Sequence, residues 1–571
     1  MKKYLLVLVS LCCVLSAAFA ENPDYPELKK SDANIIGHVL DKKTKEHLPY
    51  ITVALKGTTI GTVTDATGHY FLKNLPEGSF VLEVSSVGYK TLTRNVTLKR
   101  GKTLEEDFEI EEDAIALDGV VVSANRSETT RRLAPTLVNV VDLKLFETTN
   151  SSTLSQGLNF QPGVRVETNC QNCGFQQVRI NGLDGPYTQI LIDSRPVFSA
   201  LSGVYGLEQI PASMIERVEV MRGGGSALFG SSAIAGTINI ITKESLRNSG
   251  QLSHTITSVG GSSSFDNNTS LNASLVTDDH RAGLYIFGQN RHRSGYDYDG
   301  DGFTELPELK NQTVGFRSYL KTSTYSKLTF EYHHMQEFRR GGDMLDRPPH
   351  EAHIAEQLQH SIDGGSLKYD YFSPNEKNRL SIFASAANTD RDSYYGPGND
   401  PLKAYGKTTD LIAMGGAQYV HTFDKCLFMP SDLTAGLEYN RDRLKDNMWG
   451  YDRHTDQTVK VYSAFLQNEW KNKHWGILIG GRLDKHNMVD DVIFSPRANL
   501  RFNPTDNINL RLSYSSGFRA PQAFDEDMHI ENVGGTVAMI ERAKDLKEEK
   551  SQSFSASADM YHRFGAFQTN L

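Results

Sequence analysis

The sequence predicts a mainly β protein with three parts: an N-terminal β-sandwich domain, a central α+β domain and a transmembrane antiparallel β-barrel. Three observations support this fold class. The chain begins with an export signal, and no later run reaches the roughly 20 apolar residues that a membrane helix needs. Its second half consists of strand-sized segments joined by links that are alternately short and long. Barrel strands are not found by a search for apolar runs, because they alternate lipid-facing and lumen-facing residues.

Residues 1–20 have the layout of a secretory signal peptide. Two lysines precede an apolar run over residues 4–15, and the small residues Ala18 and Ala20 stand before Glu21. The apolar run is too short to remain as a membrane helix. We therefore expect an exported protein.

Composition and local motifs exclude two broad functions. The net charge of -9 over 571 residues provides no basic surface for nucleic acid. Neither Gly-x-Ser-x-Gly nor His-Glu-x-x-His occurs, so no secreted hydrolase or zinc protease is indicated. We expect a protein that is not an enzyme and has no nucleic-acid partner.

Residues 35–112 are predicted to form the β-sandwich domain. Short alternating runs are separated by turn signals such as Ala66-Thr67-Gly68 and Pro76-Glu77-Gly78. Through residues 61–70 and Val87-Gly88-Tyr89, this stretch resembles the carboxypeptidase-regulatory-like domain. That domain precedes the plug in many outer-membrane transporters of Bacteroidetes type.

Residues 113–130 are predicted to be a linker that carries a partner-binding segment. The segment is Asp118-Gly119-Val120-Val121-Val122, which follows an acidic stretch. A β-branched run of this kind can add to the sheet edge of a partner through main-chain hydrogen bonds. It resembles a TonB box, and the resemblance implies that TonB, with its inner-membrane energising complex, is a partner. An ordinary edge strand is the alternative.

Residues 131–243 carry a series of glycine-rich and charged motifs. Among them are Arg179-Ile180-Asn181-Gly182, Ile215-Glu216-Arg217-Val218-Glu219 and Arg222-Gly223-Gly224-Gly225-Ser226. In order and spacing they resemble the plug of TonB-dependent receptors, with Ser194 and Gly224 where that family usually has Gly and Pro. The resemblance implies these plug-core positions: Arg179, Asp193, Glu216, Arg217, Arg222, Gly223, Gly225, Gly230 and Gly236.

The glycines of the plug segment do not form a phosphate-binding loop. Gly230 is followed by two serines, so the lysine that such a loop needs is missing. We expect the glycines to permit tight turns and close backbone approach. The charged plug residues Arg179, Glu216, Arg217, Glu219 and Arg222 are expected in or near the plug's contact with a polar barrel wall.

Residues 249–571 are predicted to form the outer-membrane β-barrel, with about fifteen strands before the last residue. Among the expected long loops are residues 337–360 and 516–550, and residues 322–326 are an expected short turn. The family barrel has twenty-two strands, so the resemblance implies that the C-terminal part is missing. An open sheet would leave two unpaired edges in lipid, so we expect a fragment or a truncated gene product.

The loop after residue 294 has the spacing of a calcium loop. Its carboxylates Asp297, Asp299, Asp301 and Glu308 stand at positions one, three, five and twelve, with Gly302 at position six. Calcium takes 6–8 oxygen ligands in flexible geometry. A calcium ion that orders an extracellular loop is one interpretation, and a solvated acidic loop is the other. No other cofactor is expected.

Cys170 and Cys173 lie in the plug segment, three residues apart. In an oxidising compartment such a pair most often closes a disulfide, which is the prediction. A soft metal site, which would need further ligands, and a redox pair remain as alternatives.

Two loops contain candidate ligand-binding residues. Phe518-Arg519-Ala520-Pro521, with His529 after it, resembles a box of haem-type receptors in which a histidine can ligate iron. The companion Asn-Pro-x-Leu box is absent. His350 and His353 are further candidates in the loop predicted over residues 337–360.

The resemblance as a whole implies an active transporter of the outer membrane that is driven through TonB. Its ligand would be a metal chelate such as haem, a ferric siderophore or cobalamin, with a surface lipoprotein and outer-membrane lipid as further partners. A receptor with a mainly signalling role and an importer of oligosaccharide or peptide are the alternatives. A wide barrel is consistent with a plug, because its lumen would otherwise be open.

Overall fold

The computed structural model contains three β-rich parts. It describes residues 30–49, 51–65, 67–86, 89–111, 120–127, 129–196, 210–277, 280–396, 404–523, 530, 543, 545–564 and 567–570. Within this part of the chain, no helix is both long enough and apolar enough to cross a membrane.

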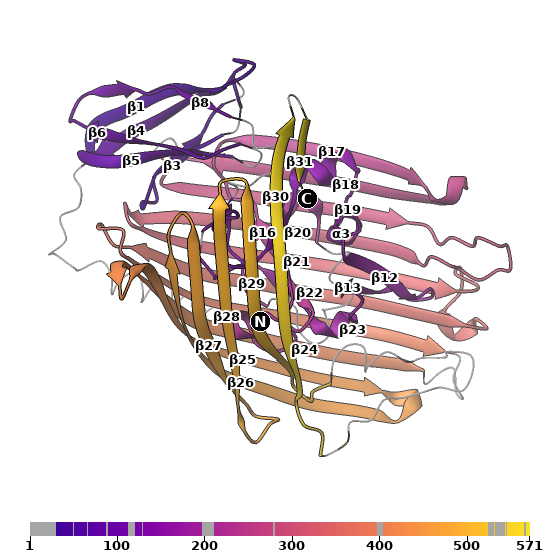
Figure 1. Ribbon diagram of the computed structural model, residues 1–571. Coiled ribbons are helices and arrows are strands. Elements are labelled where there is room, and N and C mark those ends of the chain that lie inside the picture. Colours follow the sequence, from indigo (N-terminus) through magenta and orange to yellow (C-terminus); the bar gives the residue numbers. More distant parts are fainter. Residues whose placement is uncertain are drawn as a thin grey trace.

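The N-terminal domain is a sandwich of two four-stranded sheets (Figure 1). One sheet contains β1 (Lys30–Asp41), β4 (His69–Pro76), β7 (Thr103–Glu105) and β8 (Phe108–Ile110), and the other contains β2 (Thr52–Leu55), β3 (Gly61–Val63), β5 (Gly78–Ser85) and β6 (Leu92–Leu98). Alternate residues face inward, so Ile35, Val53, Leu82 and Phe108 are buried in one core.

This sandwich contacts the short turns of the barrel. Thr59 donates its backbone N–H to the carbonyl of Thr324 at 2.9 Å, and the hydroxyl of Thr62 lies 3.3 Å from Nε2 of His280. Thr324 lies in the short turn that follows residue 323, and His280 lies in the short turn that follows residue 276. The N-terminal domain is therefore at the short-turn end of the barrel, as Figure 1 shows.

The plug is an α+β unit built on a four-stranded sheet. The order of its strands is β11 (Val138–Asp142), β15 (Ile215–Arg222), β16 (Gly236–Thr242) and β14 (Thr188–Ile192). The sheet is accompanied by α2 (Leu143–Thr148), α3 (Leu154–Leu158), α5 (Ser226–Phe229), η1 (Gly185–Tyr187), η2 (Ala212–Met214), a hairpin of β12 (Val164–Cys170) and β13 (Phe175–Ile180), and a pair of β9 (Val120–Val121) and β10 (Thr129–Thr130). The plug lies against the concave face of the large sheet (Figure 1).

The large sheet contains fifteen antiparallel strands in sequence order, within the described residues. They are β17 (Ser249–Ser258), β18 (Phe265–Val276), β19 (Ala282–Arg293), β20 (Glu308–Ser323), β21 (Ser326–Gly342), β22 (Ala355–Phe372), β23 (Asn378–Gly396), β24 (Tyr405–Cys426), β25 (Met429–Met448), β26 (Arg453–Lys471), β27 (Trp475–His486), β28 (Val492–Thr505), β29 (Ile508–Arg519), β30 (Glu549–Phe564) and β31 (Phe567–Asn570), with η3 (Val259–Gly261), η4 (Pro349–Glu351) and η6 (Trp449–Tyr451) in the links. The mainly β fold class is confirmed.

The strands of this sheet have an apolar outer face and a polar inner face. On β25, Leu437 is 66% exposed, whereas its neighbour Glu438 points inward and is 7% exposed. Leu466 and Ile479 on the next two strands are also exposed, and Gln467 is buried. This pattern is the reverse of a soluble protein and matches a barrel wall in lipid with a polar interior.

The barrel strands extend further into the long loops than the sequence predicts. The loop expected over residues 337–360 is confined to residues 343–354, because β21 continues to Gly342 and β22 begins at Ala355. Charged residues such as Glu337 and Arg339 resemble loop residues in the sequence. They are buried in the structure, where the polar interior accommodates them and strand pairing satisfies their backbone groups.

Candidate functional site

Close backbone approach requires glycine at the centre of the plug. A Cβ atom on Gly236 would lie 2.4 Å from the carbonyl oxygen of Met221 in the adjacent strand. Gly223 and Gly230 both have a φ of +81°, in the left-handed region that favours glycine. A side chain on Gly225 would lie 2.6 Å from the hydroxyl of Thr237. These glycines therefore form turns and contacts inside the plug.

A short segment directly after β9, residues 122–126, connects the plug to the barrel wall, and we call it the strap. Its plug contact is the carboxylate of Glu219 on β15, which is fully buried. Oε2 of Glu219 accepts hydrogen bonds from the backbone N–H of Val122 at 2.9 Å and from the N–H and the hydroxyl of Ser123, both at 2.8 Å. Nε of Arg217 donates to the other oxygen at 3.0 Å. A buried carboxylate with this many donors is well stabilised.

The other half of the strap is held by the barrel wall. Asn125 donates from Nδ2 to Oε2 of Glu469 at 2.6 Å, and Nη2 of Arg126 lies 2.5 Å from Oε1 of Glu438. Arg482 on β27 pairs with the same Glu438 at 2.7 Å. All of these side chains are less than one tenth exposed, so the ion pairs are shielded from water.

Strap residues Ser123, Asn125 and Arg126 were not among the sites predicted from the sequence. No local motif links them to Glu469 or Glu438, because these partners lie on distant strands of the barrel. Their position directly after the predicted partner-binding segment is the one signal in the sequence that could have indicated them.

The predicted partner-binding segment is described only in part. Asp118 and Gly119 lie outside the described residues. Val120 and Val121 form β9, which pairs antiparallel with Thr129 and Thr130. The side chain of Val121 is buried in a small apolar cluster with Ala124, Ala134 and Val138. In this structure, the last residues of the segment already have a strand partner within the plug.

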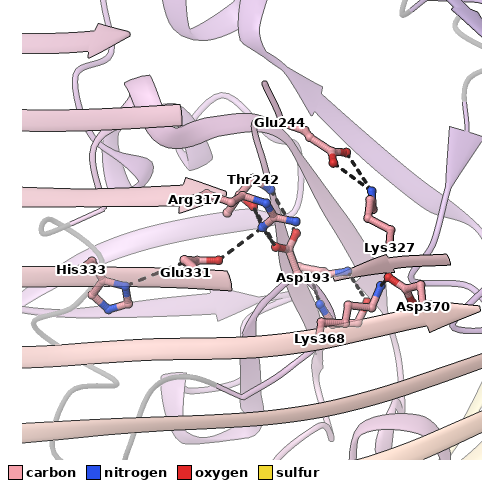
Figure 2. A network of polar contacts seen from close by, with 11 residues as sticks. Asp193, Thr242, Glu244, Arg317, Lys327, Glu331, His333, Lys368 and Asp370 are labelled. Carbon is pink, nitrogen blue, oxygen red and sulfur yellow. Dashed lines mark hydrogen bonds and ion pairs between the residues drawn. The ribbon is translucent and has the colours of Figure 1, made fainter. Parts of the chain in front are cut away.

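A second contact between plug and wall is centred on Asp193. Asp193 and Ser194 have φ values of 48° and 65° and form a two-residue hairpin turn between Ile192 and Arg195. A positive φ at the position of Ser194 favours glycine there. The turn directs Asp193 toward Arg317 on β20, and the two side chains form an ion pair (Figure 2).

Further groups extend the contact at Asp193. Thr242 donates its N–H at 3.1 Å and its hydroxyl at 2.8 Å to the carboxylate of Asp193. Burial alone would raise the pKa of Asp193, but the charge of Arg317 and these hydrogen bonds outweigh it and lower the pKa to about 2. Glu331 on β21 lies 3.3 Å from the Arg317 guanidinium, and Glu244 of the plug pairs with Lys327 at 2.8 Å (Figure 2).

The remaining charged plug residues have partners within the plug. Arg179 pairs with Glu167 and Asp184, which are both in the plug. Arg217 pairs with Glu216 and Glu219, and Arg222 donates to the carbonyl of Pro162. The expectation that these charges lie in or near the contact with the wall stays a prediction. Their partners lie on neighbouring strands and turns of the plug, where short paths bring opposite charges together.

A cavity of about 190 Å³ lies between the plug and the wall. Its plug side includes Gln177, Gln189 and residues 229–232, and its wall side includes Asp442 and Arg482. Small-molecule sites usually enclose about 300–1,000 Å³. This cavity is smaller than such a site, and both the plug and the wall contribute to its lining.

The acidic loop between β19 and β20 brings together a set of carboxylates that differs from the prediction at one position. Ligand oxygens of Asp297, Asp299, Asp301 and Glu305 lie within 4.8 Å of one another. Glu308 is the first residue of β20 and pairs with Lys310 at 2.8 Å, so its assignment to the calcium set is wrong. Strand pairing fixes Glu308, whereas Glu305 is in the loop itself.

Cys170 and Cys173 are not joined by a disulfide in this structure, so the predicted bridge is wrong here. Sγ of Cys170 donates a hydrogen bond to Oε2 of Glu356 at 3.2 Å and accepts one from the backbone N–H of Cys173 at 3.4 Å. The carboxylate on β22, which the sequence did not link to the two cysteines, engages the first thiol.

The candidate ligand-binding residues that the structure describes each have a polar partner of their own. His350 lies 2.9 Å from the hydroxyl of Tyr405, and His353 lies 2.6 Å from Oδ2 of Asp343. Arg519 pairs with Glu549 at 3.5 Å and stacks over Tyr187. His529 lies outside the described residues. Two histidines of one loop thus have separate hydrogen-bond partners, and Arg519 contacts the plug.

Family models match nearly the whole described chain. The CarboxypepD_reg-like domain matches residues 35–122, the TonB-dependent Receptor Plug Domain matches residues 130–237, and the TonB dependent receptor-like β-barrel matches residues 235–571. The barrel match alone covers more than half of the chain.

Individual relatives agree with these matches. The vitamin B12 transporter BtuB of Vibrio vulnificus (strain CMCP6) is 25% identical over 424 residues, which cover 72% of this chain and 64% of the relative. The chain thus spans less than two thirds of that relative's length.

The siderophore receptor PirA of Acinetobacter baumannii has the same fold with a TM-score of 0.64 at 18% identity, over 77% of this chain and 70% of that one. A mutant ferric enterobactin receptor PfeA of Pseudomonas aeruginosa has a TM-score of 0.61 at 18% identity, over 76% and 70%. The chain belongs to the TonB-dependent receptor family of outer-membrane β-barrel proteins.

Proposed function

We propose that the protein is an active transporter that imports a metal chelate across the outer membrane when TonB pulls on the segment before the strap. The strap is the observation that supports this most directly. Its residues bond to Glu219 inside the plug and to Glu438 and Glu469 in the wall. A force applied at Val120 therefore acts on the β9–β10 pairing and then on the strap bonds.

The energy for transport comes from the inner membrane through TonB, because the outer membrane has no ATP. In the proposed resting state the plug blocks the lumen, and transport requires its contacts with the wall to loosen. Removal of the strap from Glu438 would leave Arg482 beside a carboxylate that has lost one of its two cations. Loss of one partner in a buried ion network destabilises the arrangement, so the pull weakens the contact between plug and wall.

The metal chelate is proposed from the names of the relatives and from the loop motifs. BtuB is a vitamin B12 transporter, and PirA and PfeA are siderophore receptors. The Phe518-Arg519-Ala520-Pro521 motif keeps haem as a third candidate. We also propose that calcium orders the acidic loop through Asp297, Asp299, Asp301 and Glu305, since four carboxylates offer the hard oxygen ligands that calcium takes.

Replacement of Val120 by proline tests the transport mechanism. Proline removes an N–H group that a partner strand would use, and it leaves in place the N–H of Val122 that donates to Glu219. Isoleucine at the same position is the matched control, because it keeps the N–H group and a β-branched side chain. Cells that carry the intact protein are supplied with radiolabelled cobalamin, ferric enterobactin or haem as the single source.

The proline variant should bind its ligand at the cell surface and fail to accumulate it, whereas the isoleucine variant should accumulate it normally. Normal accumulation in the proline variant would refute transport driven through this segment. Ligand-dependent gene expression without accumulation in the unaltered protein would instead support the signalling receptor. The proposed substrate class would be refuted if the cells accumulated none of the three chelates but took up an oligosaccharide or a peptide.

A further inference from the structure

The tip of the β12–β13 hairpin holds two thiols in a fixed arrangement. Cys170 ends β12, Cys173 lies in the turn, and Gly174 adopts a φ of +68° that lets the chain reverse. The N–H of Gly174 donates to the carbonyl of Cys170 at 3.0 Å, and the N–H of Cys173 donates to Sγ of Cys170 at 3.4 Å. The turn therefore directs both sulfur atoms to the same side.

The barrel wall brings a carboxylate to this pair. Glu356 on β22 is 3% exposed, and its Oε2 accepts a hydrogen bond from Sγ of Cys170 at 3.2 Å. Cys173 is fully buried. The two sulfur atoms and the carboxylate oxygen all lie within 4.8 Å of one another. Three groups that can each lose a proton and bind a cation thus meet at one point, where Cys173 and Glu356 are buried and Cys170 is partly exposed.

The hairpin tip is held firmly against the wall around this point. A Cβ atom on Gly341 of β21 would lie 2.0 Å from the carbonyl oxygen of Asn172, so the two backbones are in direct contact. Nη1 of Arg339 donates to the carbonyl of Gly174 at 3.1 Å. Since neither contact involves the thiols or Glu356, the three groups are held together by the surrounding structure.

We propose that Cys170, Cys173 and Glu356 form a binding site for a soft or borderline transition-metal ion, with Zn²⁺ as the test case. Two thiolates favour such ions over calcium or magnesium. Three protein ligands leave a fourth tetrahedral position for water or for a donor atom of an incoming molecule. The ion joins the plug to the barrel wall, which goes beyond the transport proposal and does not depend on it.

The carboxylate distinguishes this site from a disulfide or redox pair. Oxidation of the two thiols would remove the hydrogen that Cys170 donates to Glu356 and leave the buried carboxylate without that donor. Binding of a divalent ion replaces the two thiol protons, which are released to solvent, and its charge balances two thiolates and one carboxylate to within one unit. Met448, Leu358 and Tyr395 pack in the same cluster and keep the surroundings apolar.

Cobalt titration tests the proposal on the intact protein, purified in detergent under reducing conditions and freed of metal with a chelator. Co²⁺ should produce a thiolate-to-metal charge-transfer band that saturates at one ion per protein and is displaced by Zn²⁺. Cys170→Ser and Cys173→Ser should each abolish the band. Glu356→Gln should weaken binding on the order of tenfold or more. Cys426→Ser, which changes the one described cysteine outside the cluster, should bind like the unaltered protein.

Three results would overturn the proposal. The first is the absence of a charge-transfer band in the unaltered protein, and the second is an unchanged band in the Cys170→Ser and Cys173→Ser variants. The third is a disulfide between Cys170 and Cys173 in protein taken from outer membranes, detected by alkylation and mass spectrometry without reductant. Protection of both thiols from alkylation by bound Zn²⁺, reversed by chelator, supports the site even if a serine variant fails to fold.

Discussion

The buried carboxylate of Glu219 accepts hydrogen bonds from both the backbone N–H and the hydroxyl of Ser123, each at 2.8 Å. This relationship ties the segment after the proposed TonB box to the central sheet of the plug. Because Glu219 is fully buried and also pairs with Arg217, its loss cannot be compensated by water from the surface.

Glu219→Gln should loosen the strap without unfolding the barrel. A neutral amide oxygen accepts more weakly than a carboxylate, and the change should destabilise the closed strap by about 2 kcal/mol. Hydrogen exchange at the amides of Val122 and Ser123 should then rise by roughly thirtyfold. Glu147→Gln, which alters an exposed carboxylate of the plug, is the control. Equal exchange in the two variants would contradict the anchoring role of Glu219.

The contact between plug and wall at Asp193 should weaken in acid. The pKa of Asp193 is lower in the folded protein than its ordinary value of 3.8. The resulting stabilisation is fully present above that ordinary value and is lost as the pH falls toward about 2.

Asp193→Asn should remove this part of the acid dependence. In thermal unfolding of the purified protein, the plug of this variant should lose less stability between about pH 4 and about pH 2 than the plug of the unaltered protein. Glu147→Gln should leave the acid dependence unchanged. An identical pH profile for Asp193→Asn would show that the Arg317 pair contributes nothing to stability.

Gly236→Ala should disrupt the plug. The added Cβ would approach the carbonyl oxygen of Met221 within 2.4 Å, and both atoms belong to paired backbone strands that cannot move apart cheaply. Overpacking of this kind destabilises by about 1–3 kcal/mol or more. Gly250→Ala, where no atom lies within 4 Å of the added Cβ, is the matched control. Limited proteolysis of outer membranes should cleave the plug of the first variant faster, and equal cleavage would count against the backbone clash.

Calcium binding at the acidic loop should depend on Glu305 and not on Glu308. Glu305→Gln removes one of the four clustered carboxylates, whereas Glu308→Gln alters a residue that pairs with Lys310. Calorimetry with Ca²⁺ should show affinity reduced by about tenfold in the first variant, since affinity follows the ligand charge count. A loss confined to Glu308→Gln would restore the ligand set expected from spacing alone.

Much of the fold was predictable because it depends on local patterns. Alternation over 4–8 residues marks a strand, and glycine-rich turns mark where strands end. The predicted strand number of about fifteen agrees with the described sheet. Loop lengths such as residues 337–360 were less well predicted, because charged residues on lumen-facing strands have the same composition as loops.

The pairing of side chains was the harder problem. Spacing placed four carboxylates in one calcium set, but the start of β20 fixes Glu308 in a strand and leaves Glu305 in the loop. Spacing also favoured a disulfide between Cys170 and Cys173, whereas Glu356 on a distant strand engages the first thiol. A local motif contains no information about a partner that the barrel wall brings from far along the chain.

The sequence by itself determined the order of the three domains and the family, because each depends on motifs within a short stretch. Only the tertiary structure decided how the plug is held. Arg126 meets Glu438, Asp193 meets Arg317, and Ser123 meets Glu219. Each pair joins elements far apart in the chain, and burial in a polar interior strengthens these contacts.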